Sequence, residues 1–183
     1  SVLRMLEQFL GEDVMRRGIR EYIKAHQYGN APAADLWAAL EAASGRPVPA
    51  IARDWFARPG FPLVTVSAEG PGLQAITLEQ SRFLADPAAR PGAEAPWAIP
   101  LTLAFEDDQG IRRHRVLLTG ARATVALPAD GKVRWAYANA GEQGFYRTRY
   151  DRGLRDALAA STARLSPEER FGLLDNTWAL AQK

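Results

Sequence analysis

The chain changes from helical to strand periodicity within the stretch Ile51-Ala-Arg-Asp-Trp-Phe-Ala-Arg-Pro-Gly-Phe-Pro-Leu-Val-Thr-Val66. Its first half places apolar residues at helical spacing on one face. Pro59-Gly60 and then Pro62 prevent the helix from continuing, because proline lacks the backbone donor that a helix needs. The β-branched residues that follow favour a strand. We therefore expect a helical unit before this stretch and a β unit after it, with Phe61 packed at the seam.

Four helices are expected before this break. They cover residues 2–10, a stretch from Glu12 that Gly29-Asn30 ends, a stretch from Pro32 to Ser44-Gly45, and one that starts at Val48 or Pro49. Their connections are short, which favours neighbouring antiparallel or perpendicular pairs. The expected buried face of the second helix consists of Val14, Ile19, Tyr22 and Ile23.

Alternating apolar residues and turn signals predict a run of short strands after the break. The candidates are residues 62–68, 73–82, 97–106, 111–118, 122–127 and 133–138. Such spacing is typical of a β-sandwich of about 80 residues. Residues 85–96 are rich in Pro, Ala and Gly, so we expect a loop there.

Helical spacing returns after Tyr150. The sequence Ser166-Pro167-Glu168-Glu169 has the residues of a capping box, and the apolar face that follows consists of Phe171, Leu174, Trp178 and Ala181. The expected fold class is α+β with several units: an N-terminal helical bundle, a central immunoglobulin-like antiparallel β-sandwich and C-terminal α-helices.

The composition is that of a globular protein, with 47% hydrophobic and 24% charged residues. A net charge of only +2 argues against nucleic acid as a partner. Without Cys the chain has no disulfide or thiolate chemistry, and no apolar run reaches the length of a membrane span. The compartment stays open, with a slight preference for a soluble cytoplasmic protein. Both ends lie within helical patterns, so we expect a piece of a longer protein.

Few residues carry chemistry. His26 fits the last turn of a helix, where the dipole favours it, better than a binding role. His114 lies in Arg112-Arg113-His114-Arg115, which favours a solvated strand edge over an anion or nucleic-acid patch. Glu106-Asp107-Asp108 is more typical of a hairpin turn than of a weak Ca²⁺ site. The five Trp residues are spread over core-like positions, and no serine elbow or phosphate-binding glycine loop is present.

Three ordered groups of residues resemble the aminopeptidase N family of zinc metallopeptidases. The first group is Ser1-Val-Leu-Arg-Met-Leu-Glu7, Leu10-Gly-Glu-Asp13, Tyr28-Gly-Asn30, Asp35-Leu-Trp37 and Ala39-Leu-Glu41. The second is Trp55-Phe56, Pro59-Gly-Phe-Pro62 and Val64. The third is Asn139, Gly141, Gly144-Phe-Tyr-Arg147, Tyr150, Arg170, Leu173-Leu-Asp175 and Ala179-Leu-Ala181. Each group alone is weak, whereas the ordered set spans essentially the whole chain.

The resemblance implies an architecture. Residues 1–60 would be the C-terminal helices of the catalytic domain, residues 61–146 a small β-sandwich domain, and residues 147–183 the start of a C-terminal helical domain. Tyr146 and Arg147 match structural motifs, whose expected role is packing at the domain seam.

The resemblance also implies zinc and peptide substrates in the parent protein. The family's His-Glu-x-x-His motif, its downstream Glu and its Gly-x-Met-Glu-Asn strand are all missing from this sequence. We therefore assign no catalytic, cofactor-binding or metal residue, and we expect this fragment to bind no zinc and to be inactive alone.

Two hypotheses about function follow. One is a fragment of a zinc aminopeptidase that removes N-terminal residues from peptides, whose partners are the rest of the catalytic domain and the C-terminal helical domain. The alternative is a non-enzymatic β-sandwich adaptor or protein-binding module. In either case we expect the end helices, residues 2–10 and 166–182, to expose apolar faces through which the fragment self-associates, with Leu6 and Phe9 among the exposed residues.

Overall fold

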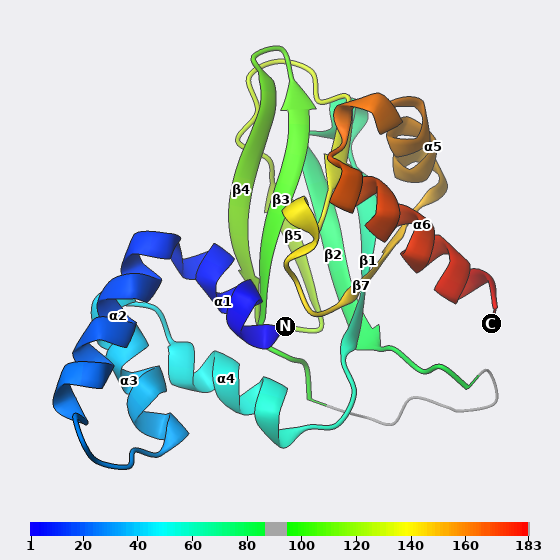
Figure 1. Ribbon diagram of the computed structural model, residues 1–183. Helices are drawn as coiled ribbons and strands as arrows, with labels where there is room; N and C mark the ends of the chain where they lie inside the picture. The colour runs from blue at the N-terminus through cyan, green and yellow to red at the C-terminus, as the bar shows by residue number, and fades with distance from the viewer. Residues whose placement is uncertain (87–94, 183) are drawn as a thin grey trace.

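A computed structural model describes residues 1–86 and 95–182 of the chain. The expected loop at residues 85–96 falls mostly outside these residues. The N-terminal helices lie at one end of the sheets, and the C-terminal helices lie beside the strands toward the other end (Figure 1). The coarse expectation of a mixed α and β protein is confirmed.

The N-terminal helices begin and end close to where the sequence predicts. They are α1 (Val2–Leu10), α2 (Glu12–Ala25), α3 (Ala33–Ser44) and α4 (Val48–Ala57). Helix α3 ends at Gly45 in the left-handed conformation, as its stop signal predicts. Helices α2 and α3 approach closely at Gly18, where an added Cβ would lie 2.7 Å from a methyl carbon of Leu40. The expected burial of Ile23 is wrong: its side chain is 56% exposed, because the contact with α3 runs along the Gly18 face instead.

In the described part of the chain, seven strands form two sheets. The first has the order β5 (Arg122–Ala126), β2 (Ala75–Arg82), β1 (Pro62–Glu69) and β7 (Arg147–Tyr150). The second has the order β4 (Gly110–Leu118), β3 (Ile99–Asp107) and β6 (Trp135–Tyr137). The short helices η1 (Pro71–Leu73), η2 (Ala140–Glu142) and η3 (Thr162–Arg164) lie in connections, and α5 (Arg152–Ala160) and α6 (Pro167–Ala181) follow the last strand.

Strand β7 corrects the expected all-antiparallel arrangement. It pairs parallel to β1, with Leu63 opposite Arg147 and Val66 opposite Tyr150, whereas the other strand pairs are antiparallel. A parallel partner requires a long crossover, and here the connection contains the whole of the second sheet. Local periodicity carries no signal for such a pairing, so residues 147–150 were absent from the predicted strands.

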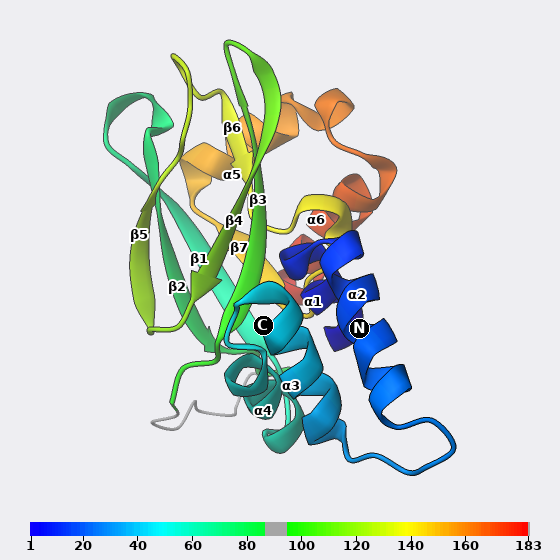
Figure 2. The ribbon, with the colours of Figure 1, turned by 90° about the vertical axis from the view of Figure 1, so that its left-hand side faces the viewer.

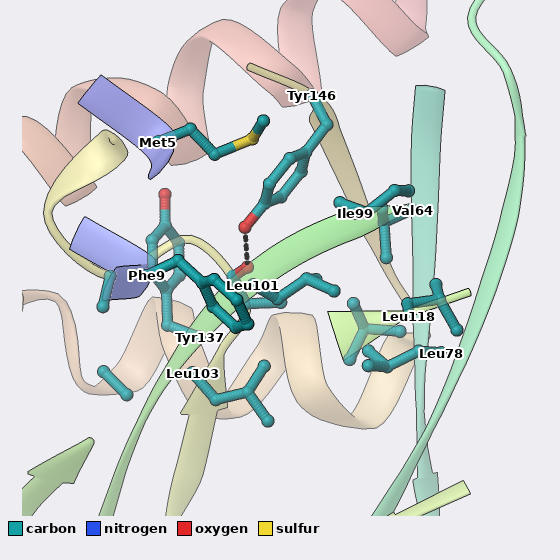
Figure 3. Packing of buried hydrophobic residues seen from close by; sticks show 14 of the residues in the cluster. Met5, Phe9, Val64, Leu78, Ile99, Leu101, Leu103, Leu118, Tyr137 and Tyr146 are labelled. Carbon is teal, nitrogen blue, oxygen red and sulfur yellow. Dashed lines mark hydrogen bonds between the residues drawn. The ribbon is translucent and has the colours of Figure 1, made fainter. Parts of the chain in front are cut away.

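One hydrophobic core joins the two sheets and helix α1. Val64 and Leu78 of the first sheet, Leu101 of the second and Phe9 of α1 all belong to it (Figure 3). The expected exposure of α1 is therefore wrong. Leu6 is 0% and Phe9 is 4% exposed, because α1 packs against β3.

The opposite end of the chain behaves as expected. In α6 the side chains of Phe171, Leu174 and Trp178 are 72%, 71% and 67% exposed. The predicted capping box is confirmed, with the Ser166 hydroxyl accepting from the Glu169 N–H and the Glu169 carboxylate accepting from the Ser166 N–H. The core-like position expected for Trp178 is wrong, since α6 contacts the rest of the chain through its other face.

The stretch at residues 51–66 forms the expected seam between helices and strands. Trp55 of α4 is buried, and its indole N–H donates to the carbonyl of Ala98 at 2.9 Å. Phe61 stacks on Phe83 with ring centroids 5.3 Å apart and also contacts Phe145 at 5.7 Å. These contacts fix the direction in which the chain passes from α4 into β1.

Candidate functional site

Part of the third motif group meets other residues in a buried polar junction, which we define as Tyr137, Asn139, Glu142, Tyr146, Arg147, Tyr150 and Glu169. Of these, only Asn139, Tyr146, Arg147 and Tyr150 belong to the motif group. Asn139 organises the turn that contains η2. Its side-chain oxygen accepts from the Gly144 N–H at 2.8 Å, and its amide donates to a Glu142 carboxylate oxygen at 3.3 Å. Gly144 is required here, because a Cβ would clash with the Tyr146 ring.

Three tyrosines supply hydroxyl groups to the junction. The Tyr146 hydroxyl donates to the carbonyl of Ala138 at 2.7 Å (dashed line in Figure 3). The Ala138 N–H donates to the Tyr150 hydroxyl oxygen at 2.9 Å, and the ring of Tyr150 stacks on Tyr137 at 5.9 Å. Burial raises the pKa of Tyr137, Tyr146 and Tyr150 above the ordinary value, so all three remain neutral phenols.

Two carboxyl groups lie in the same junction. Glu169, at the first turn of α6, is 6% exposed and accepts from the N–H groups of Gly141 and Ser166, both at 2.9 Å. Glu142 accepts a hydrogen bond from the Tyr137 hydroxyl. Burial raises the pKa of Glu142 to about 7; the bond from Tyr137 opposes the shift and the Glu169 carboxylate adds to it. Sequence reasoning missed Glu142, because nothing in its neighbourhood indicates that α6 will cover it.

Arg147 connects β7 to α6. Its guanidinium forms an ion pair with the Asp175 carboxylate at 2.7 Å and also donates to the side-chain oxygen of Asn176 at 3.2 Å. The Asn176 amide in turn donates to the Thr148 hydroxyl at 3.2 Å. These contacts support the expected role of Tyr146 and Arg147 in packing at the seam.

The other candidate residues lie apart from the junction. His26 is the C-terminal cap residue of α2, with its Nε2 3.3 Å from the Asp35 carboxylate. His114 lies on β4, which is an edge strand. Among residues 1–86 and 95–182, neither histidine belongs to a group of three or more side chains that could hold a metal ion.

In the acidic turn Glu106-Asp107-Asp108, the Asp107 carboxylate is fully engaged by partners within the protein. The Asp107 carboxylate accepts from the N–H groups of Asp130 and Gln109 and pairs with Arg112 at 3.1 Å. The bond from Asp130 is the main reason why the pKa of Asp107 is lowered. Within residues 1–86 and 95–182, no group of three or more His, Asp or Glu side chains is placed to hold a metal ion, so these residues do not fit a zinc site.

Comparison with known proteins places the motif groups in a family. Residues 1–55 match the family model described as the Peptidase family M1 domain. Aminopeptidase M1 of Arabidopsis thaliana is 36% identical over 98% of this chain and 21% of its own length. The chain belongs to the aminopeptidase N (M1) family. It does so as a segment, since it spans about a fifth of the length of the curated relatives that it matches.

Other relatives of this M1 segment come from distant organisms. Puromycin-sensitive aminopeptidase of Caenorhabditis elegans is 35% identical over 98% of the chain and 19% of its own length. Tricorn protease-interacting factor F2 of Thermoplasma volcanium is 31% identical, with 98% and 21% covered. The likeness therefore extends well beyond residue 55, through both sheets and into α6. None of the helices in the described part of the chain is both long and apolar enough to cross a membrane.

Proposed function

We propose that the chain is the connecting segment of a zinc-dependent aminopeptidase that removes N-terminal residues from peptides. The observation that carries the proposal is the likeness to aminopeptidases over 98% of the chain. The zinc ligands and catalytic residues would lie outside residues 1–183. The role of this segment would be to hold the catalytic domain against the domains that follow it.

The proposal includes three domain boundaries. Residues 1–60 would close the catalytic domain, residues 61–146 would form an immunoglobulin-like β-sandwich, and residues 147–183 would begin a C-terminal helical domain. The family-model match at residues 1–55 and the break at Pro59-Gly60 support the first boundary. At the second boundary the connection is tight, since β7 pairs with β1 and the Asp151 carboxylate accepts from both the Leu154 and the Ala68 N–H groups.

The isolated chain should show no peptidase activity. We expect no hydrolysis of an aminoacyl chromogenic amide when the purified 183-residue chain is incubated with zinc, because the described residues hold no metal-binding group that could activate water. The longer polypeptide encoded by the same gene should hydrolyse the amide and lose activity with a chelator.

Assays of the isolated chain and of the longer polypeptide test two different parts of the proposal. Chelator-sensitive turnover by the isolated chain that survives repurification would contradict the proposed location of the active site. A longer polypeptide that contains no zinc and is inactive would contradict the aminopeptidase itself and favour the adaptor hypothesis.

A further inference from the structure

Helix α6 covers the η2 turn at the position of Glu142. An added Cβ on Gly172 would clash with the Glu142 carboxyl group, so the helix backbone lies directly on this side chain. Glu142 itself has a φ of +52°, a left-handed conformation that residues other than glycine rarely adopt. The chain thus accepts local backbone strain to hold a carboxyl group beneath α6.

When Glu142 is ionised, the Tyr137 hydroxyl has two acceptors at this contact but only one proton to donate. The Tyr137 hydroxyl lies within hydrogen-bonding distance of a Glu142 carboxylate oxygen and of the backbone carbonyl of Glu169, the latter at 3.1 Å. One hydroxyl proton cannot be donated fully to both acceptors. A proton on Glu142 would donate to the Tyr137 oxygen, which frees the hydroxyl of Tyr137 to donate to α6.

The charges around Glu142 also favour a neutral group. The charged groups that face it are Glu169 and Asp175 from α6 and Arg147 from β7, and Tyr137 faces it from β6. Arg147 is already paired with Asp175. An ionised Glu142 would therefore lie near the Glu169 carboxylate with little compensating positive charge.

We propose that Glu142 acts as a pH-responsive latch, which holds helix α6 on the η2 turn when its carboxyl group is protonated and loosens this contact when the group ionises. The latch lies at the η2 turn, which follows β6 and lies beside α6 (Figure 2). It is independent of the peptidase proposal, because it concerns only how two parts of this chain are joined.

The direction of the pH effect follows from linkage. Folding raises the pKa of Glu142 from 4.5 to about 7, mainly through burial. The docked state therefore binds this proton more tightly than the undocked state. The stabilisation is complete below the unfolded-state pKa and is lost as the pH rises through about 7.

Amide hydrogen exchange of α6 in the 183-residue chain tests the latch. Between pH 5.5 and 8.5, after correction for intrinsic exchange rates, the opening equilibrium should rise on the order of tenfold, with allowance for solvent screening of a partly exposed group. Glu142→Gln keeps the size and hydrogen-bonding capacity of the side chain but cannot titrate. This variant should show a flat profile at the protected, low-pH level.

Glu168→Gln is the matched control. Glu168 lies on the first turn of α6, close in sequence to Glu169, but hydrogen bonds from its own N–H and the Ser166 hydroxyl lower its pKa, so it does not titrate in this range. This variant should retain the wild-type pH slope. A slope that persists in Glu142→Gln, or that disappears equally in Glu168→Gln, would overturn the proposal.

A second variant tests the contact without changing any charge. Gly172→Ala favours helix formation intrinsically, but its Cβ would displace the Glu142 carboxyl group. We expect faster α6 exchange at pH 5.5 and a weaker pH slope. Exchange unchanged from wild type would show that Glu142 does not lie under α6 and would contradict the latch. In the wild-type chain, a carbon-13 titration of the Glu142 carboxyl group with a midpoint below pH 5 would also contradict it.

Discussion

Replacing Leu6 by alanine should lower the free energy of unfolding of the chain by about 2–5 kcal/mol, the usual cost of removing a buried leucine side chain. Leu6 is fully buried in α1, in the core cluster that α1 shares with both sheets. The cavity would lie where a helix and a sheet meet, so neither element alone can close it. Urea unfolding followed by circular dichroism would measure the change.

Leu3→Ala provides the matched control on the same helix. The Leu3 side chain is 45% exposed, so its loss should cost about 1 kcal/mol or less. Equal small effects of the two substitutions would show that α1 does not dock on β3. The original expectation of an uncovered N-terminal helix would then be right after all.

The isolated chain should self-associate through α6. Phe171, Leu174 and Trp178 follow helical spacing on one face and are all more than two-thirds exposed. Each large apolar side chain left in water forgoes roughly 1.5–3 kcal/mol of burial. A second copy of the chain can cover this face by packing its own α6 against it. Sedimentation at micromolar concentration should therefore show species above the monomer mass.

Changing all three residues of this face to serine should restore the monomer and abolish binding of a hydrophobic dye. The control is Ile23→Ser, which removes a single exposed apolar side chain, 56% exposed, on α2. This control should associate as the wild type does. A wild-type chain that is strictly monomeric and binds no dye would contradict the prediction.

Local signals predicted the elements of this chain well, because they act within a few residues. Pro59-Gly60 ends α4 near residue 57, and the capping box at Ser166 starts α6 at the next residue. The predicted strands agree with the observed ones to within about two residues. The end of α4 and the start of α6 both depend on backbone donors and on φ restrictions of the residues themselves.

The candidate site could be predicted only in part. The residues from Asn139 to Tyr150 were recognised as a motif group, and they do meet in one junction. Glu142 was not singled out, although it is a carboxyl group whose pKa the junction raises to about 7. Its environment comes from α6, which follows 25 residues later at Pro167.

The sequence by itself determined where most helices and strands begin and end, with β7 as the exception, and which family the chain resembles. Both are encoded in local backbone chemistry and in ordered motifs. The tertiary structure alone decided that β7 joins β1 in parallel and that Glu142 lies beneath α6. It also decided that α1 is buried against β3, whereas the apolar face of α6 is exposed to solvent. Each of these depends on which distant segments bury their surfaces together. That choice is set by the free energy of the whole core, which no single stretch of sequence contains.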